Sequence, residues 1–90
     1  NSMNWITVNG SKLPEQLRVL ILEDMENFRV HLVNDLKTLG FRGTFTECPD
    51  LATALQSFDP KNYDVIFSDW NLPDGTGMDF LRRVRSSKAS

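Results

Sequence analysis

The sequence predicts an α/β domain in which a parallel sheet is built from three successive strand–helix units. Three features lead to this prediction: strand-like runs at 17–22, 43–48 and 64–68, helical spacing of apolar residues after each run, and turn-forming residues between the units. Strands that alternate with helices form parallel sheets with right-handed crossovers. A chain of 90 residues and 10.3 kDa accommodates one such domain with a thin core.

The first unit begins with residues 17–22, where apolar side chains at nearly every position are typical of a strand buried on both faces. A helix is predicted after this strand, because apolar residues then recur three or four positions apart. Gly40 stands where helices commonly end. The predicted buried face of the helix consists of Met25, Phe28, Leu32, Leu36 and Leu39.

The second unit has the same plan. Residues 43–48 contain alternating Thr and Phe and favour a strand, and Asp50 is expected to cap a short helix. A turn is expected at 59–62, where Asp, Pro, Lys and Asn follow one another. The apolar face of this helix is predicted to be Leu51, Ala54, Leu55 and Phe58.

The third unit is predicted as a strand at 64–68, a loop at 69–75 and a final helix. Thr76 and Asp79 have the spacing of a capping box, in which each residue bonds the backbone of the other at a helix start. The apolar face of this last helix is predicted to be Met78, Leu81 and Val84.

Residues 1–16 are interpreted as an N-terminal extension outside the main fold, and residues 17–90 as the domain itself. Asn1 and Ser2 precede Met3 and resemble the remnant of a purification tag. Residues 5–8 are strand-like and are followed by a turn-forming Asn-Gly pair.

Composition excludes several classes of protein. Hydrophobic residues make up 40% and charged residues 24%, which are values of ordinary globular domains rather than of disordered chains or coiled coils. No apolar run approaches the roughly 18 residues of a membrane span, and no secretory signal is recognised, so no membrane partner is expected. A single cysteine cannot form an internal disulfide. A cytoplasmic location is therefore expected.

Charge argues against a nucleic-acid partner. Residues 1–80 contain twelve acidic and six basic residues, whereas residues 81–90 contain four basic residues and no acid. The basic end is interpreted as cations in the last turns of a helix, where the helix dipole favours them.

Three acidic residues stand at predicted strand ends. Glu23 and Asp24 follow the first strand and Asp69 follows the third, and these strands are neighbours in the usual order of such sheets. Repelling carboxylates at one sheet edge require a raised pKa or a cation, and an all-oxygen site suits Mg²⁺. Asp69 is then a candidate nucleophile toward phosphorus. Individually, Asp24 could instead cap the first helix, and Asp69 could start an Asx-turn.

The residues around these acids resemble the receiver domain of two-component response regulators, in particular the single-domain chemotaxis type. The resemblance rests on Leu20–Asp24, on the string Phe67-Ser68-Asp69-Trp70-Asn71-Leu72-Pro73, and on Gly77. It implies a flavodoxin-like doubly wound sheet, here incomplete, with βαβαβα connectivity and strand order 2-1-3. This strand order is implied by the family resemblance.

The resemblance also implies the roles of individual residues. Asp69 corresponds to the phosphoacceptor, Asp24 to the direct Mg²⁺ ligand, and Glu23 to the neighbouring acid that acts through water. Asn71 corresponds to the residue whose backbone carbonyl completes the metal site. Glu23 replaces a more usual Asp.

The likeness covers only the first three of the family's five strand–helix units. The Ser or Thr and the Lys that bind the phosphoryl group, and the aromatic switch residue, have no counterparts here, so phosphotransfer is expected to be weak. The third strand would be an exposed apolar edge, which predicts a homo-oligomer joined through that edge unless residues 5–8 cover it.

The implied function is that of a phosphoacceptor module, which takes a phosphoryl group from a histidine kinase or phosphotransfer protein onto Asp69 with Mg²⁺. Such a module promotes its own phosphorylation and is not a turnover enzyme. The alternative is a non-catalytic half-domain that serves dimerisation or partner binding.

Overall fold

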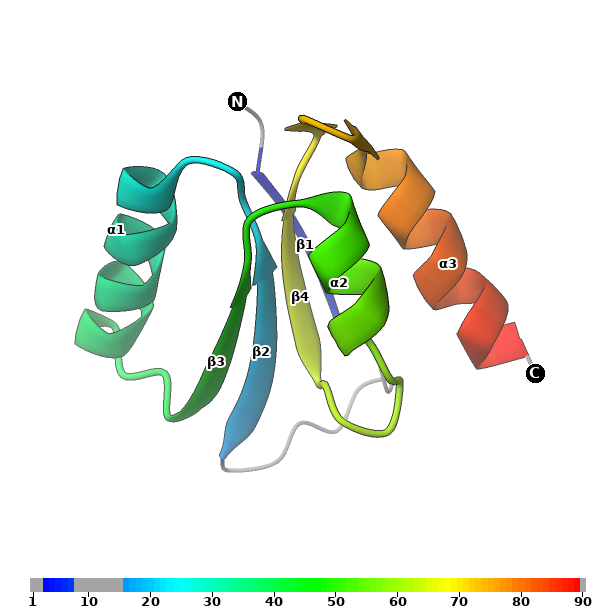
Figure 1. Cartoon of the computed structure of the whole chain (residues 1–90). Coiled ribbons are helices and arrows are strands. Elements are labelled where there is room, and N and C mark those ends of the chain that lie inside the picture. Colours follow the sequence, from blue (N-terminus) through cyan, green and yellow to red (C-terminus); the bar gives the residue numbers. More distant parts are fainter. Residues whose placement is uncertain (1–2, 8–15, 90) are drawn as a thin grey trace.

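The computed structural model describes residues 3–7 and 16–89, which form a four-stranded sheet with helices on both faces (Figure 1). The elements are β1 (Met3–Thr7), β2 (Leu17–Leu22), α1 (Glu26–Thr38), β3 (Gly43–Cys48), α2 (Leu51–Ser57), β4 (Val65–Asp69), β5 (Asn71–Leu72), β6 (Gly75–Thr76) and α3 (Gly77–Ala89). Within these described ranges, no helix is both long and apolar enough to cross a bilayer.

The parallel part of the sheet has the expected topology. Strand β2 lies between β3 and β4 and is parallel to both, which is the predicted order 2-1-3. The bounds of β2 and β3 are those predicted, whereas β4 starts one residue later than expected and includes Asp69. The predicted α/β, flavodoxin-like class is therefore confirmed.

The N-terminal segment differs from the prediction. Met3–Thr7 is strand β1, which pairs antiparallel with β4 along its whole length, so the expectation that it lies outside the main fold is wrong for these residues. Strand β4 consequently has a neighbour on each side, and the open edge on which the homo-oligomer expectation rested is covered. The interpretation of Asn1 and Ser2, and of residues 8–15, falls outside the described ranges. The domain boundary at residue 17 remains a prediction.

Two apolar cores lie on opposite faces of the sheet, because successive strand residues point to opposite sides. On one face α1 packs over the odd-numbered residues of β2 and β4. On the other face α2 and α3 pack over the even-numbered residues, including Leu20, Leu22 and Ile66. Phe80 of α3, which the sequence pattern did not single out, is the largest fully buried side chain of this second core.

The buried face of α1 is rotated relative to the prediction. Val33 and Leu36 are buried, but Met25, Phe28 and Leu39 are 41%, 50% and 78% exposed. One turn before Val33 the inward-facing position is taken by Arg29, a charged residue that an apolar pattern cannot reveal. The predicted helix is correct, and its predicted core face is wrong at these three positions.

The predicted helix caps are confirmed. Asp50 is the N-cap of α2, and its Oδ1 accepts a hydrogen bond from Thr53 N at 2.7 Å. At α3, Thr76 N donates to Asp79 Oδ2 at 3.0 Å and Asp79 N donates to Thr76 Oγ1 at 3.3 Å. Each contact satisfies an amide that the helix itself leaves unbonded.

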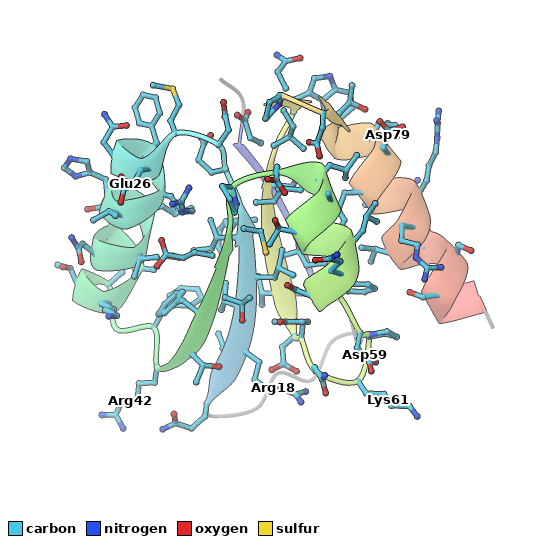
Figure 2. The ribbon with its side chains drawn as sticks, viewed as in Figure 1. Arg18, Glu26, Arg42, Asp59, Lys61 and Asp79 are labelled. Atoms are coloured by element: carbon cyan, nitrogen blue, oxygen red, sulfur yellow. The ribbon has the colours of Figure 1, made fainter. Side chains whose placement is uncertain are left out.

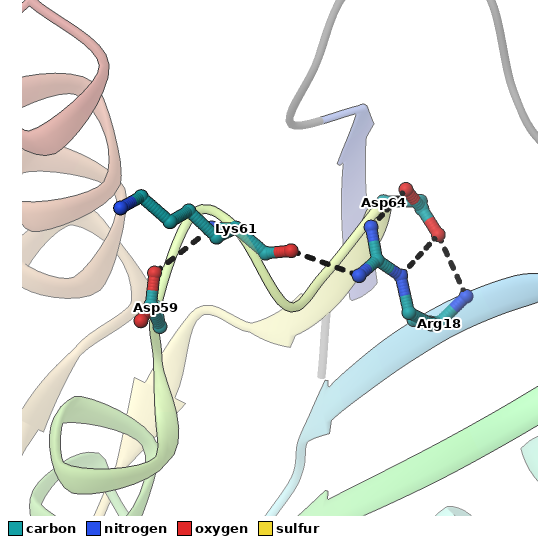
Figure 3. A network of polar contacts seen from close by, with 4 residues as sticks. All are labelled: Arg18, Asp59, Lys61 and Asp64. Carbon is teal, nitrogen blue, oxygen red and sulfur yellow. Dashed lines mark hydrogen bonds and ion pairs between the residues drawn. The ribbon is translucent and has the colours of Figure 1, made fainter.

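An ion pair that the sequence did not indicate joins the amino ends of β2 and β4 (Figure 3). Arg18 Nη2 and Nε donate to the two carboxylate oxygens of Asp64 at 3.0 and 3.1 Å, and Arg18 N donates to Asp64 Oδ2 at 2.9 Å. Arg18 Nη1 also donates to the carbonyl of Lys61 at 2.8 Å. Hydrogen bonds from Arg18 hold the pKa of the buried Asp64 below its usual range.

We expect Asp64→Ala to lower the free energy of unfolding by about 2 kcal/mol at neutral pH, because charge-assisted bonds to a buried carboxylate are lost. A lowered folded-state pKa contributes stability that is present above the unfolded pKa and is lost as pH falls through the folded value. Urea unfolding should therefore show a difference from wild type that shrinks in acid. An equal loss in the exposed control Asp35→Ala would contradict this account.

Candidate metal centre

The site lies where β2 and β4 end side by side. Leu22 pairs with Ser68, so Glu23 and Asp24 leave β2 next to Asp69, the last residue of β4. Carboxylate oxygens of the three acids all lie within 4.8 Å of one another. This is the carboxyl edge of the parallel strands, at the top of Figure 1, where ligands bind in open α/β sheets.

The opposite edge of the sheet carries charges of both signs. Figure 2 labels Arg18, Arg42, Lys61 and Asp59 at that edge, and Arg18 is paired there with Asp64. The three carboxylates at the carboxyl edge instead converge, which attracts a cation to them.

The three acids differ in their exposure to solvent. Asp69 and Glu23 are buried, at 0% and 2% exposure, whereas Asp24 is exposed to solvent. Asp69 Oδ1 accepts a hydrogen bond from Trp70 N at 2.7 Å. Asp69 Oδ2 has no hydrogen-bond partner, and within the described residues it is the one buried side-chain oxygen or nitrogen in that condition. An unpaired buried oxygen is costly unless a ligand satisfies it.

Backbone hydrogen bonds hold Glu23 through its carboxylate and through its own N–H group. Its Oε2 accepts from Met25 N at 3.2 Å, and its own N–H donates to the carbonyl of Cys48 at 3.0 Å. Burial, followed by the neighbouring acids Asp24 and Asp69, raises the pKa of Glu23 to about 7. The site therefore resists ionisation of this carboxyl until a positive charge compensates it.

Neither of the local structural roles considered for Asp24 and Asp69, a helix cap and an Asx-turn, is observed. Met25, not Asp24, is the N-cap of α1, and no side chain caps that helix. Asp69 accepts from the next amide, Trp70 N, rather than from the amide two residues on that defines an Asx-turn. Asp24 is thus free of a capping role.

Residues 69–75, predicted as a loop, contain a small hairpin. Strands β5 and β6 pair Asn71 with Thr76, and Gly77 N donates to the carbonyl of Trp70 at 2.7 Å. A Cβ on Gly77 would lie 2.5 Å from the carbonyl oxygen of Asp69, so glycine is needed for this close approach. The hairpin places Asn71 two residues beyond Asp69, and the role of its carbonyl remains a prediction.

Two further residues bond to backbone near the site, and the sequence did not predict these contacts. Arg29 Nη1 donates to the carbonyl of Glu23 at 2.7 Å, and Arg29 Nε lies 3.1 Å from Glu47 Oε1. Asp74, in the β5–β6 turn, accepts from the backbone of α2. The spacing of Arg29, one helical turn before Val33, could have indicated that Arg29 faces the sheet. No local pattern indicates the contact of Asp74 with α2.

The donor set fits a hard divalent cation. Three carboxylates converge, one oxygen is buried and unpaired, and within the described residues no basic side chain is in hydrogen-bond contact with these carboxylates. Mg²⁺ prefers oxygen ligands and keeps several waters, which the exposed side of Asp24 permits. The arrangement can therefore hold Mg²⁺ and present an aspartate beside it.

Comparison with known proteins agrees with this geometry. The model of the response regulator receiver domain family matches residues 19–90, which is most of the chain. This chain belongs to that family. Receiver domains are generally signalling modules of two-component systems, and Glu23, Asp24 and Asp69 lie at the strand ends that the sequence resemblance indicated.

Several curated proteins are similar to the chain. "Chemotaxis protein CheY" of Pseudomonas aeruginosa is 39% identical over 72 residues, covering 80% of this chain and 57% of that protein. "Chemotaxis protein CheY-3" of Vibrio cholerae is 33% identical over 76 residues, covering 84% and 58%. "Sensor protein EvgS" of Escherichia coli is 32% identical over 78 residues, covering 87% of this chain and 6% of that protein.

The chain spans a little under three-fifths of the length of the two chemotaxis proteins that it matches. No solved structure matches it significantly.

Proposed function

We propose that this receiver domain is a phosphoacceptor that takes a phosphoryl group onto Asp69 with the help of Mg²⁺ bound by Glu23, Asp24 and Asp69. The observation that supports it is the convergence of the three carboxylates around the unpaired, buried Asp69 Oδ2. Asn71 is proposed to add its backbone carbonyl to the metal site.

In this proposal the donor is a phosphohistidine of a histidine kinase or phosphotransfer protein. A carboxylate oxygen of Asp69 forms a P–O bond while the P–N bond to the histidine breaks, and the electron pair returns to the imidazole, which takes up a proton. Mg²⁺, when bound, neutralises charge on the phosphoryl oxygens. Trp70 N, bonded to Asp69 Oδ1, keeps the carboxylate fixed in orientation.

Asp24 and Glu23 are proposed to contribute to metal binding in different ways. Asp24 is exposed and able to contact a solvated ion. That Glu23 acts through water is proposed from the family resemblance alone. The similarity to chemotaxis proteins and to a sensor protein supports a signalling role. A cytoplasmic location and the absence of catalytic turnover are part of the proposal.

Long incubation with Mg²⁺ and a small acyl phosphate should label the chain slowly and substoichiometrically. Slow labelling is expected of these 90 residues, because they include no counterpart of the Lys and the Ser or Thr that bind the phosphoryl group in the family. Intact-mass measurement followed by peptide mapping should place the label on Asp69, and Asp69→Asn or chelation of Mg²⁺ should abolish it. Labelling at another residue, metal-independent labelling or no labelling at all would contradict the proposal.

A further inference from the structure

We propose that Asp74 is a positioning residue for the metal centre: it fastens the β5–β6 hairpin, which follows Asp69, to the start of α2. This inference rests on the proposed function, because it names a device that holds the proposed Asn71 ligand in place. Asp74 does not itself belong to the carboxylate cluster.

Two hydrogen bonds connect Asp74 of the hairpin to the start of α2. Asp74 Oδ1 accepts from Leu51 N at 2.8 Å, and Asp74 Oδ2 accepts from Ala52 N at 3.0 Å. Both amides belong to the first turn of α2, where the helix leaves its own N–H groups unbonded. Asp74 lies in the two-residue turn between β5 and β6, so one carboxylate ties the tip of the hairpin to α2.

Close packing accompanies these bonds. A Cβ on Gly75 would lie 2.5 Å from Leu51 Cδ2, so the hairpin backbone rests directly against the side chain of the same helical turn. Leu72 of β5 packs against the core cluster that contains Leu51. The hairpin therefore packs against α2 in a defined position.

The start of α2 is also connected to the other half of the acidic site. It follows β3 directly, and the carbonyl of Cys48, the last residue of β3, accepts from Glu23 N. The segment Cys48–Ala52 is thus bonded to Glu23 on one side and to Asp74 on the other. Direct pairing of β2 with β4 already places Glu23 beside Asp69, and this segment adds a second connection, between Glu23 and the hairpin that carries Asn71. A metal site with ligands from two loops requires such support for each loop.

The same helix start offers a matched control. Asp50 caps α2 through Thr53 N, and among the described residues its side chain makes no hydrogen bond to the hairpin. Asp50→Ala and Asp74→Ala each remove carboxylate bonds to the first turn of α2, and each should lower the thermal midpoint by about 5 °C. Only Asp74→Ala also releases the hairpin.

The experiment compares wild type, Asp74→Ala, Asp74→Asn and Asp50→Ala in two measurements. Calorimetric titration with magnesium chloride at about pH 8, where Glu23 is ionised, should show the Mg²⁺ dissociation constant raised about tenfold by Asp74→Ala and unchanged by Asp50→Ala. Asp74→Asn keeps one acceptor oxygen and should give an intermediate value. Amide hydrogen exchange without metal should accelerate across residues 70–76 in Asp74→Ala only.

The outcomes separate this inference from the proposed function. Equal Mg²⁺ affinity in Asp74→Ala and wild type, or equal weakening in Asp50→Ala, overturns the positioning role. If wild type binds no Mg²⁺, the proposed function fails, and the exchange measurement still decides whether Asp74 holds the hairpin. If Asp74→Ala does not fold, the comparison of Asp74→Asn with Asp50→Ala takes its place under the same criteria.

Discussion

Replacing Gly43 with alanine is expected to cost about 4 kcal/mol or more and to leave the chain largely unfolded. A Cβ at this position would lie 1.6 Å from the carbonyl oxygen of Leu17 and 2.7 Å from its nitrogen. These are backbone atoms of the neighbouring strand, so no side-chain rotation relieves the overlap. The φ angle of Gly43 is +145°, a conformation that other residues rarely adopt.

The effect should reach the carboxylate cluster. Gly43 pairs with Leu17 at one end of the β2–β3 register, and Leu22 pairs with Cys48 at the other. Pushing the strands apart at Gly43 weakens the register that brings Glu23 N to the carbonyl of Cys48. Circular dichroism and urea unfolding measure the loss.

Gly40 provides the matched control. Its φ angle is +95°, but a Cβ there would meet no heavy atom within 4 Å, so Gly40→Ala should cost only about 1 kcal/mol of conformational strain. Equal stability losses in the two variants would show that contact with Leu17 is unimportant and would contradict the described β2–β3 pairing.

Glu23→Gln is expected to stabilise the metal-free protein at about pH 8 and to abolish its stabilisation by Mg²⁺. Because burial raises the pKa of Glu23 from 4.5 to about 7, the folded protein holds this proton more tightly than the unfolded chain. The resulting stability is fully present below the unfolded pKa and is lost as pH rises through the folded value. The loss is about 3 kcal/mol in the metal-free wild type, since each pKa unit corresponds to about 1.4 kcal/mol.

Glutamine stays neutral, so the variant should keep its stability across this pH interval in urea unfolding with chelator present. Added Mg²⁺ should stabilise wild type at about pH 8, since it binds the ionised carboxyl, and should have little effect on the variant. Glu26→Gln, which removes an exposed carboxylate in the first turn of α1, should behave like wild type in both measurements. A metal-free pH profile of Glu23→Gln identical to that of wild type would contradict the raised pKa.

Local sequence patterns were sufficient for the parallel sheet and its helix caps. The nearly continuous apolar run of β2 and the Thr-Phe-Thr of β3 predicted the bounds of both strands correctly. Asp50 caps α2, as its position indicated. The core face of α1 was not predictable from spacing alone. Apolar residues occur on two adjacent faces of this helix, and packing against the sheet buries the face with Val33 and Leu36.

Features that depend on distant partners escaped the sequence reasoning. Strand β1 was recognised as strand-like, but its pairing with β4 depends on which edge of the sheet is available. Arg18 and Asp64 are separated by 46 residues, and Asp74 and Leu51 by 23, so no local spacing joins them. By contrast, the acids at 23, 24 and 69 could be grouped in advance because parallel strand ends meet at one sheet edge.

The most direct test of the account is a calorimetric Mg²⁺ titration of wild type and Asp24→Asn. Asp24 is exposed and caps no helix, so its replacement should leave the fold intact while removing one proposed ligand. The account predicts saturable binding at a single site in wild type and loss of that binding in Asp24→Asn. Absence of saturable binding in the folded wild-type protein, or identical binding in the variant, would contradict it.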